Sequence, residues 1–295
     1  MSNNTTILNR FFTRNVISEL IHTGPNEVYK AVVRRYVNDP ESKSHGEIIS
    51  EIYEVIGKEK RNEYFYMNTL LNKLLARHNV NRTTALSQIW IGQSKADFVM
   101  INGIGTVYEI KSELDNFERL ESQLRDYYKA FSFVNVVTAA HEFDNVKSIL
   151  SSIDGIGDFV GVYALTPRDT RSRELSRKAE LCDVFLDHRY IFKLLRKREY
   201  ENVVCSYFGT LPQATPVFHY KACLDSFCEI PILKAQALAF KELKKRNKIE
   251  KAVFNRVPDE LKSVVYFSGL SRDLPALSRV LETKYGGQEH VFPVF

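Results

Sequence analysis

Two acidic residues and a lysine interrupt an otherwise apolar segment, "KADFVMINGIGTVYEIK", which runs from residue 95 to residue 111. Asp97 stands in the first apolar run, Glu109 in the second, and Lys111 follows two residues after Glu109. Two neighbouring carboxylates need positive charge between them, or one of them must stay protonated. Lys111 supplies a single charge, whereas Mg²⁺ is bound by one or two carboxylates together with water or phosphate oxygens. The residue types therefore predict a metal site with an ammonium beside it, which suits chemistry at a phosphate.

The two apolar runs are expected to form neighbouring antiparallel strands. The residues between them, Asn102 to Ile104, have the composition of a short hairpin turn. A three-residue loop places Asp97 opposite Glu109, with Cβ atoms about 4.5–5.5 Å apart. Lys111 then projects from the same face as Glu109, about 7 Å further along the strand. A loop longer by one residue would place Asp97 opposite Ile110 instead, and the site would be lost.

Hydrophobic periodicity predicts an α/β core between helical segments. Residues 1–60 have apolar positions three and four apart, as do most of residues 169–295, and both segments are expected to be mainly helical. Residues 61–168 instead alternate helical segments with short runs rich in β-branched and aromatic residues. The expected strands are "TALSQIWIG", "ADFVMI", "TVYEIK", "VNVVTA" and "DFVGVYAL". The predicted fold is a central mixed sheet flanked by helices, with helical additions at both ends.

The order of these residues resembles the PD-(D/E)xK nuclease superfamily. Asp97 precedes Glu109-Ile110-Lys111 on consecutive strands, and an amphipathic helix follows. The string "YEIKSELDNFERLESQLRDYYKAF" also resembles an uncharacterised bacterial subgroup of that superfamily, and the resemblance extends from about Asn62 to Thr166. It implies a restriction-endonuclease-like fold and Mg²⁺-dependent hydrolysis of phosphodiester bonds, most often in DNA, with Mn²⁺ as a substitute. Roles in phage defence or mobile-element biology are implied by the same resemblance.

The resemblance also implies roles for individual residues. Asp97 and Glu109 would bind the metal, with the Ile110 carbonyl as a further ligand. Lys111 would orient the attacking water or stabilise the pentavalent phosphate. Glu-x-Lys occurs five times in the chain, but the copy that ends at Lys111 is the one in an apolar strand preceded by a second strand with an acid. One departure from the superfamily is Ala96, which stands where proline often precedes the aspartate.

The helix after the second strand adds three candidates. Gln123 and Tyr127 form Gln-x-x-x-Tyr, which resembles the motif that follows the catalytic strand in RecB-like nucleases. Arg119, Gln123 and Tyr127 are four residues apart, so they share one face of the helix. Gln123 could hold the lysine or a water molecule, and Arg119 could meet a phosphate. Tyr127 is also expected to belong to the hydrophobic core.

A further metal ligand from the helix that precedes the strands would fit the same resemblance. Glu63 in "RNEYFYMNTLL" is the first candidate, and Glu47 and Glu51 are rivals. An acidic residue at a helix start also has a simpler explanation, because it stabilises the helix dipole.

Positive charge is modest overall and concentrated locally. The net charge of +5 is compatible with a polyanionic partner. Lys95 adjoins the candidate site and could contact a nucleic-acid backbone, and the densest basic stretch contains Lys244, Lys245 and Arg246. The alternative for these residues is a solvated turn and a solvated helix face. The expected partner is DNA, with a protein partner or a second copy of the chain also open.

Composition excludes several other classes. No run of about 18 apolar residues occurs, so no membrane span is expected. Four irregularly spaced cysteines, with no pattern of a zinc site, predict reduced thiols and a cytoplasmic protein. Three alternatives to an active nuclease stay open at this point. They are a buried salt-bridge cluster from an inactive ancestor, a nucleic-acid- or protein-binding module with an idle or partner-activated site, and a phosphoesterase that takes small nucleotides in a closed pocket.

Overall fold

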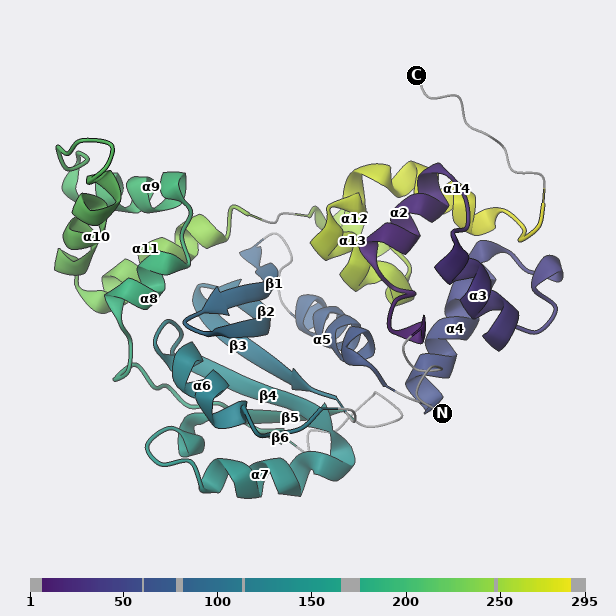
Figure 1. Cartoon of the computed structure of the whole chain (residues 1–295), viewed down its shortest axis with the longest axis horizontal. Helices are drawn as coiled ribbons and strands as arrows, with labels where there is room; N and C mark the ends of the chain where they lie inside the picture. The colour runs from purple at the N-terminus through teal and green to yellow at the C-terminus, as the bar shows by residue number, and fades with distance from the viewer. Residues whose placement is uncertain are drawn as a thin grey trace. The chain divides into compact units, whose positions relative to one another are not determined.

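The computed structural model contains one mixed six-stranded sheet and helices that flank it (Figure 1). The structure describes residues 7–59, 61–77, 82–112, 115–165, 176–246 and 249–287. The predicted fold class, a mixed α/β sheet with helices around it, is confirmed. None of the helices in these ranges has the length and apolar character needed to cross a membrane.

The chain forms two compact units. One contains residues Met1–Arg77 together with Ile249–Phe295, and the other contains His78–Lys248. This grouping differs from the three expected segments, 1–60, 61–168 and 169–295. The two ends of the chain share a hydrophobic core in the first unit, and periodicity read along a sequence carries no information about such a distant pairing.

The first unit is helical. Its helices are α2 (Arg14–His22), α3 (Glu27–Tyr36), α4 (His45–Glu59), α5 (Glu63–Arg77), α12 (Lys251–Arg256), α13 (Lys262–Ser268) and α14 (Leu274–Glu282). Asn68 of α5 connects the two ends of the chain. Its side chain donates to the Asp259 carbonyl at 2.7 Å and accepts from the Ser263 amide at 2.8 Å. Because Asn68 is fully buried, these bonds satisfy an amide that would otherwise be costly to desolvate.

The second unit holds the sheet, whose strands follow chain order. They are β1 (Thr84–Ile91), β2 (Ser94–Asn102), β3 (Ile104–Lys111), β4 (Phe133–Ala139), β5 (Gly161–Leu165) and β6 (Ser176–Arg177). β1, β2 and β3 are antiparallel, β3, β4 and β5 are parallel, and β6 is antiparallel to β5. Parallel neighbours require crossover connections. Here α6 (Leu120–Tyr128) connects β3 to β4, and α7 (Phe143–Ser151) connects β4 to β5.

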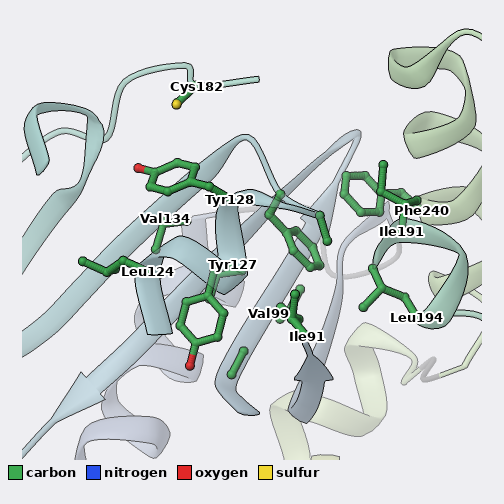
Figure 2. Close-up of a cluster of buried hydrophobic side chains, with 14 of the residues drawn as sticks. Ile91, Val99, Leu124, Tyr127, Tyr128, Val134, Cys182, Ile191, Leu194 and Phe240 are labelled. Carbon is green, nitrogen blue, oxygen red and sulfur yellow. The ribbon is translucent and has the colours of Figure 1, made fainter. Parts of the chain in front are cut away.

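Helix α6 is held against the sheet by an apolar face. Its buried residues include Leu124 and Tyr127, which belong to one cluster with Val99 of β2 and Val134 of β4 (Figure 2). Four further helices complete the unit, namely α8 (His188–Lys193), α9 (Lys197–Phe208), α10 (His219–Glu229) and α11 (Ile232–Leu243). Phe240 of α11 extends the cluster, since it stacks on Phe131 with ring centroids 5.1 Å apart.

The β2–β3 hairpin has the predicted register. Ile101 pairs with Gly105 and Val99 with Val107, as a three-residue loop requires. Gly103 occupies the turn at φ +82°, a conformation that glycine adopts without a steric penalty. The regular pairing ends at Phe98 and Tyr108, one position before the two acidic residues.

Candidate active site

Glu109 lies at the centre of a buried hydrogen-bonded cluster. Only 2% of the residue is exposed. Its Oε1 atom accepts from Gln123 Nε2 at 2.6 Å and lies 3.1 Å from Lys111 Nζ, while its Oε2 atom accepts from the Tyr127 hydroxyl at 2.6 Å. A carboxylate offers about four lone-pair sites. Among the described residues three donors use them, so Glu109 is firmly oriented and has capacity for one more partner.

Lys111 is held between Glu109 and Gln123. Its side chain is 8% exposed, and Nζ donates to Gln123 Oε1 at 2.8 Å. An ammonium has three N–H groups. Two of these N–H groups have acceptors among the described residues. The third can donate to a group that is not among those residues, such as a substrate oxygen. Gln123 therefore links the two ions, because its amide oxygen accepts from the lysine and its amide nitrogen donates to the glutamate.

Helix α6 supplies the two residues that orient the ion pair. Gln123 and Tyr127 lie one turn apart on the face whose side chains bond to Glu109 of β3, as their spacing of four predicts. Burial, together with the charge of Glu109 and its hydrogen bond, raises the pKa of Tyr127. The charge of Asp97 acts in the same direction, so both carboxylates lie near this hydroxyl. Tyr127 accordingly remains a protonated donor.

Asp97 occupies the point where β2 and β3 part. Its Oδ2 atom accepts from the Ile110 amide at 2.9 Å, just beyond the last regular pair of the two strands. Its Oδ1 atom lies 3.4 Å from Gln88 Nε2 on β1. The side chain is half-buried, in contrast to Glu109. The two acids thus lie on adjacent strands, each one position beyond the last regular pair, and they differ in burial.

Gln88 is a residue of the site that sequence reasoning missed. Its φ of +57° is unusual for a residue other than glycine. Such backbone conformations cost about 1–3 kcal/mol and cluster at functional sites. The local sequence does not predict this conformation, because glutamine is not a turn-forming residue. Because its side chain contacts Asp97, Gln88 belongs to the candidate site.

Asp126 was also missed, and it fixes the end of the β1–β2 hairpin to α6. Its Oδ2 atom accepts from the Gln93 amide and the Ser94 hydroxyl, each at 2.9 Å, and its Oδ1 atom pairs with Lys129 at 2.9 Å. Burial raises the pKa of Asp126, but the hydrogen bonds from Lys129, Ser94 and Gln93 outweigh it, so the net shift is downward. At Gly92, φ is +65° and an added Cβ atom would lie 2.6 Å from Asp126 Oδ1.

The remaining predicted residues are placed as follows. Arg119 is the exposed residue that caps α6, one turn before Gln123. Glu63 begins α5 in the other compact unit. Its rivals, Glu47 and Glu51, lie on α4 of that same unit. Glu47 accepts from the Ser44 amide at 2.7 Å, and Glu51 pairs with Lys43 at 2.6 Å. These contacts give Glu47 a capping role at the start of α4 and place Glu51 in an ion pair within the helical unit.

The C-terminal basic stretch is largely used within its own unit. Arg246 donates to Glu199 of α9 through Nε at 2.7 Å and through Nη2 at 2.5 Å, and to the Leu194 carbonyl at 2.6 Å. Lys245 pairs with Glu242. The half-buried Lys244 accepts from the Thr84 hydroxyl through its carbonyl at 3.0 Å. The contacts of Arg246 support a structural role for it, and a nucleic-acid role for the three residues stays a prediction.

The donor chemistry of the site fits a hard divalent cation. Asp97 and Glu109 offer carboxylate oxygens, which Mg²⁺ prefers. In the described ranges, no group of three or more His, Cys, Asp or Glu side chains has the arrangement of a metal site. Two carboxylates lie within the one or two that Mg²⁺ uses when water and substrate phosphate supply its other ligands.

A family model for bacteriophage P4 protein cII matches residues 57–264 of the chain. The chain belongs to this family. Comparisons with curated proteins and with solved structures give no match. The P4 cII match includes the whole sheet and every residue of the cluster around Glu109. Its description names a protein and no activity, so function has to be argued from the site.

Proposed function

We propose that the protein is a metal-dependent nuclease that hydrolyses phosphodiester bonds, with DNA as its substrate. The observation that carries this proposal is the cluster of Asp97, Glu109 and Lys111, in which two carboxylates on adjacent strands are accompanied by one ammonium. A cluster with this surplus of negative charge is costly to bury. A bound divalent cation would remove the cost, which supports a catalytic role over a purely structural one.

Mg²⁺ is the proposed cofactor, with Mn²⁺ as a substitute, and Asp97 and Glu109 are the residues that would hold it. When bound, the metal would activate water and offset the negative charge that develops on the phosphate. The Ile110 carbonyl is a further proposed ligand. In hydrolysis the water oxygen bonds to phosphorus, one ester oxygen leaves and takes a proton, and the products are a phosphate monoester and an alcohol.

The chain's own residues have separate tasks in this scheme. Lys111 has one N–H group without an acceptor among the described residues, and that group can donate to a phosphate oxygen or orient the attacking water. Gln123 holds the lysine at 2.8 Å and so fixes where the ammonium points. Tyr127 holds the other side of Glu109 at 2.6 Å and cannot be deprotonated at ordinary pH.

Cleavage of circular single-stranded DNA and supercoiled plasmid tests the proposal, with Mg²⁺ or Mn²⁺ present. Lys111→Met and Asp97→Asn should each lower the rate about 100-fold or more, because each removes a charged group at the reacting phosphate. Matched controls are Lys58→Met on α4 and Asp158→Asn, both at exposed positions, and these should cleave like wild type. Cleavage that survives both site substitutions would refute the assignment.

The alternative is a nucleic-acid- or protein-binding module whose site is idle, or active only with a partner. The three donors around Glu109 favour this alternative, because they already use most of the hydrogen-bonding capacity of that carboxylate. Calorimetric titration with Mn²⁺ separates the two readings. A nuclease site should bind Mn²⁺ and lose it with Asp97→Asn, whereas an idle site should show the same weak binding in both proteins.

We place this activity in the cytoplasm, where the four free thiols would remain reduced. The match to a bacteriophage protein family favours mobile-element biology over host defence. Lys95 and Arg119 are the proposed contacts with the nucleic-acid backbone. Lys244 and Lys245 are retained as secondary candidates.

A further inference from the structure

Trp90 is the single tryptophan of the chain, and it lies exposed on the edge strand of the sheet. The residue is 63% exposed on β1, the first strand in the sheet order. Its partner in the β1–β2 register is Lys95, whose ammonium lies 5.6 Å from the centre of the indole ring. An exposed indole beside a cation offers an aromatic face and a positive charge together. This is the combination that binds a base and its phosphate in single-stranded nucleic acids.

The strands that carry this pair are held rigidly. Trp90 and Lys95 flank the two-residue turn at Gly92 and Gln93, and Asp126 of α6 fixes that turn through the Gln93 amide and the Ser94 hydroxyl. The close approach of Gly92 to Asp126 leaves no room for a larger residue. The backbone that carries Trp90 is therefore held in place, so binding would have to order only the side chains of the pair.

The pair also lies close to the candidate active site along the backbone. Lys95 and Asp97 are two residues apart on β2, which corresponds to about 7 Å. The Lys95 carbonyl lies 3.2 Å from the Tyr127 hydroxyl oxygen, which also contacts Glu109. One helix, α6, thus positions both the cluster around Glu109 and the hairpin that carries Trp90.

We infer that Trp90 and Lys95 form a stacking platform for an unpaired base, so that the substrate is a single-stranded segment of nucleic acid. A base in a duplex is already stacked on its neighbours, and its face is not available to an indole. A single strand has free faces, and the ammonium of Lys95 can neutralise the adjoining phosphate. The inference rests on the proposed function in taking the substrate to be a nucleic acid, and it adds the strand state.

Intrinsic fluorescence tests this inference directly, because all tryptophan emission comes from Trp90. The full-length protein is titrated with a short oligothymidylate, and separately with a DNA hairpin of the same nucleotide number whose two strands are joined by a non-nucleotide linker, so that every base is paired. EDTA is present throughout, so that no cleavage occurs. The oligothymidylate should quench the emission as it binds, whereas the hairpin should bind more weakly and leave the emission nearly unchanged.

Anisotropy of a labelled oligothymidylate then measures the variants. Trp90→Ala should raise Kd about tenfold, and Trp90→Phe should restore most of the affinity because it keeps an aromatic face. Lys95→Gln should weaken binding and lower the slope of log Kd against log salt by about 0.7, the value for one phosphate contact with a single strand. Phe218→Ala is the matched control, since Phe218 is also 63% exposed in the same unit, and its Kd should not change.

The inference is overturned by equal binding and quenching with the hairpin, by unaltered affinity of Trp90→Ala, or by the absence of binding to either probe. None of these results depends on cleavage. If the protein cleaves DNA and Trp90→Ala binds it as well as wild type does, the nuclease proposal stands and the stacking platform is refuted. If single strands quench the emission but no DNA is cleaved in Mg²⁺, the stacking platform stands and the nuclease proposal is refuted.

Discussion

Glu109 and Glu199 are two buried or nearly buried carboxylates of the same compact unit, and they sit in opposite charge environments. Each accepts from three donors, and each is paired with a cation. Glu199 lies between Arg246 and Arg196, whose hydrogen bonds and charges outweigh the effect of burial and lower its pKa. Glu109 is paired with a single ammonium, that of Lys111, and a second carboxylate, Asp97, lies on the adjacent strand.

The difference separates a structural ion pair from a candidate site. The Arg246 guanidinium binds both oxygens of Glu199, which is a rigid, directional contact between α9 and the residues after α11. That pair leaves no negative charge to be offset. Among the described residues, the group around Glu109 has two carboxylates to one ammonium, so it has a deficit of positive charge that a divalent cation would fill. Burial of an ion pair alone therefore does not mark a site, whereas a local surplus of one sign does.

The largest difference between the two clusters is expected when the same charge is removed from each. Glu109→Gln should lower the DNA cleavage rate about 100- to 1000-fold, because it removes one of the two carboxylates proposed to hold the metal. Glu199→Gln makes the identical chemical change and should leave the rate per folded molecule unchanged. Initial rates in Mg²⁺, normalised to the folded fraction, measure both. Equal losses in the two variants would mean that the clusters do not differ in function.

The next effect concerns stability. Arg246→Met should lower the free energy of unfolding by about 3 kcal/mol, because it leaves the largely buried Glu199 without its partner. Arg125→Met on α6 is the control, since both Arg125 and its partner Glu121 are about half exposed and loss of this pair should cost less than about 1 kcal/mol. Urea unfolding followed by circular dichroism gives both values. If Arg246→Met proved as mild as its control, the pair would not be a clamp between helices.

The sequence was sufficient for the parts of the site that depend on local spacing. The turn at Gly103 sets the register of its hairpin, so it brings Asp97 and Glu109 to matching positions on neighbouring strands. The spacing of Gln123 and Tyr127 places both on one helix face, and the structure brings them to Glu109. These relations follow from periods of two and of three to four residues, which a sequence displays directly.

Contacts between distant segments could not be predicted in this way. Gln88 has a positive φ and contacts Asp97 of the neighbouring strand, and Asp126 fixes a turn more than 30 residues before it in the chain. Arg246 belongs to the densest basic stretch, yet its partner Glu199 is 47 residues away. In the other unit, Asn68 joins segments separated by 191 and 195 residues. Such pairs become visible only when the chain is folded, because no local pattern distinguishes them from solvated polar residues.

The smallest effects are expected at two adjacent tyrosines, which repeat the comparison within one helix. Tyr127 and Tyr128 are both fully buried on α6, and their hydroxyls point in different directions (Figure 2). The Tyr127 hydroxyl contacts Glu109, whereas the Tyr128 hydroxyl has no hydrogen-bond partner in the part of the chain that the structure describes.

Tyr127→Phe should slow cleavage about tenfold, because Glu109 loses a donor that orients it, and should cost about 1 kcal/mol of stability. Tyr128→Phe should leave cleavage unchanged and be neutral or stabilising by up to about 1 kcal/mol, since it removes a buried group that is unsatisfied. Cleavage rates and urea unfolding of the two variants decide the matter: equal effects at both positions would show that the hydroxyl of Tyr127 serves packing and not the orientation of Glu109.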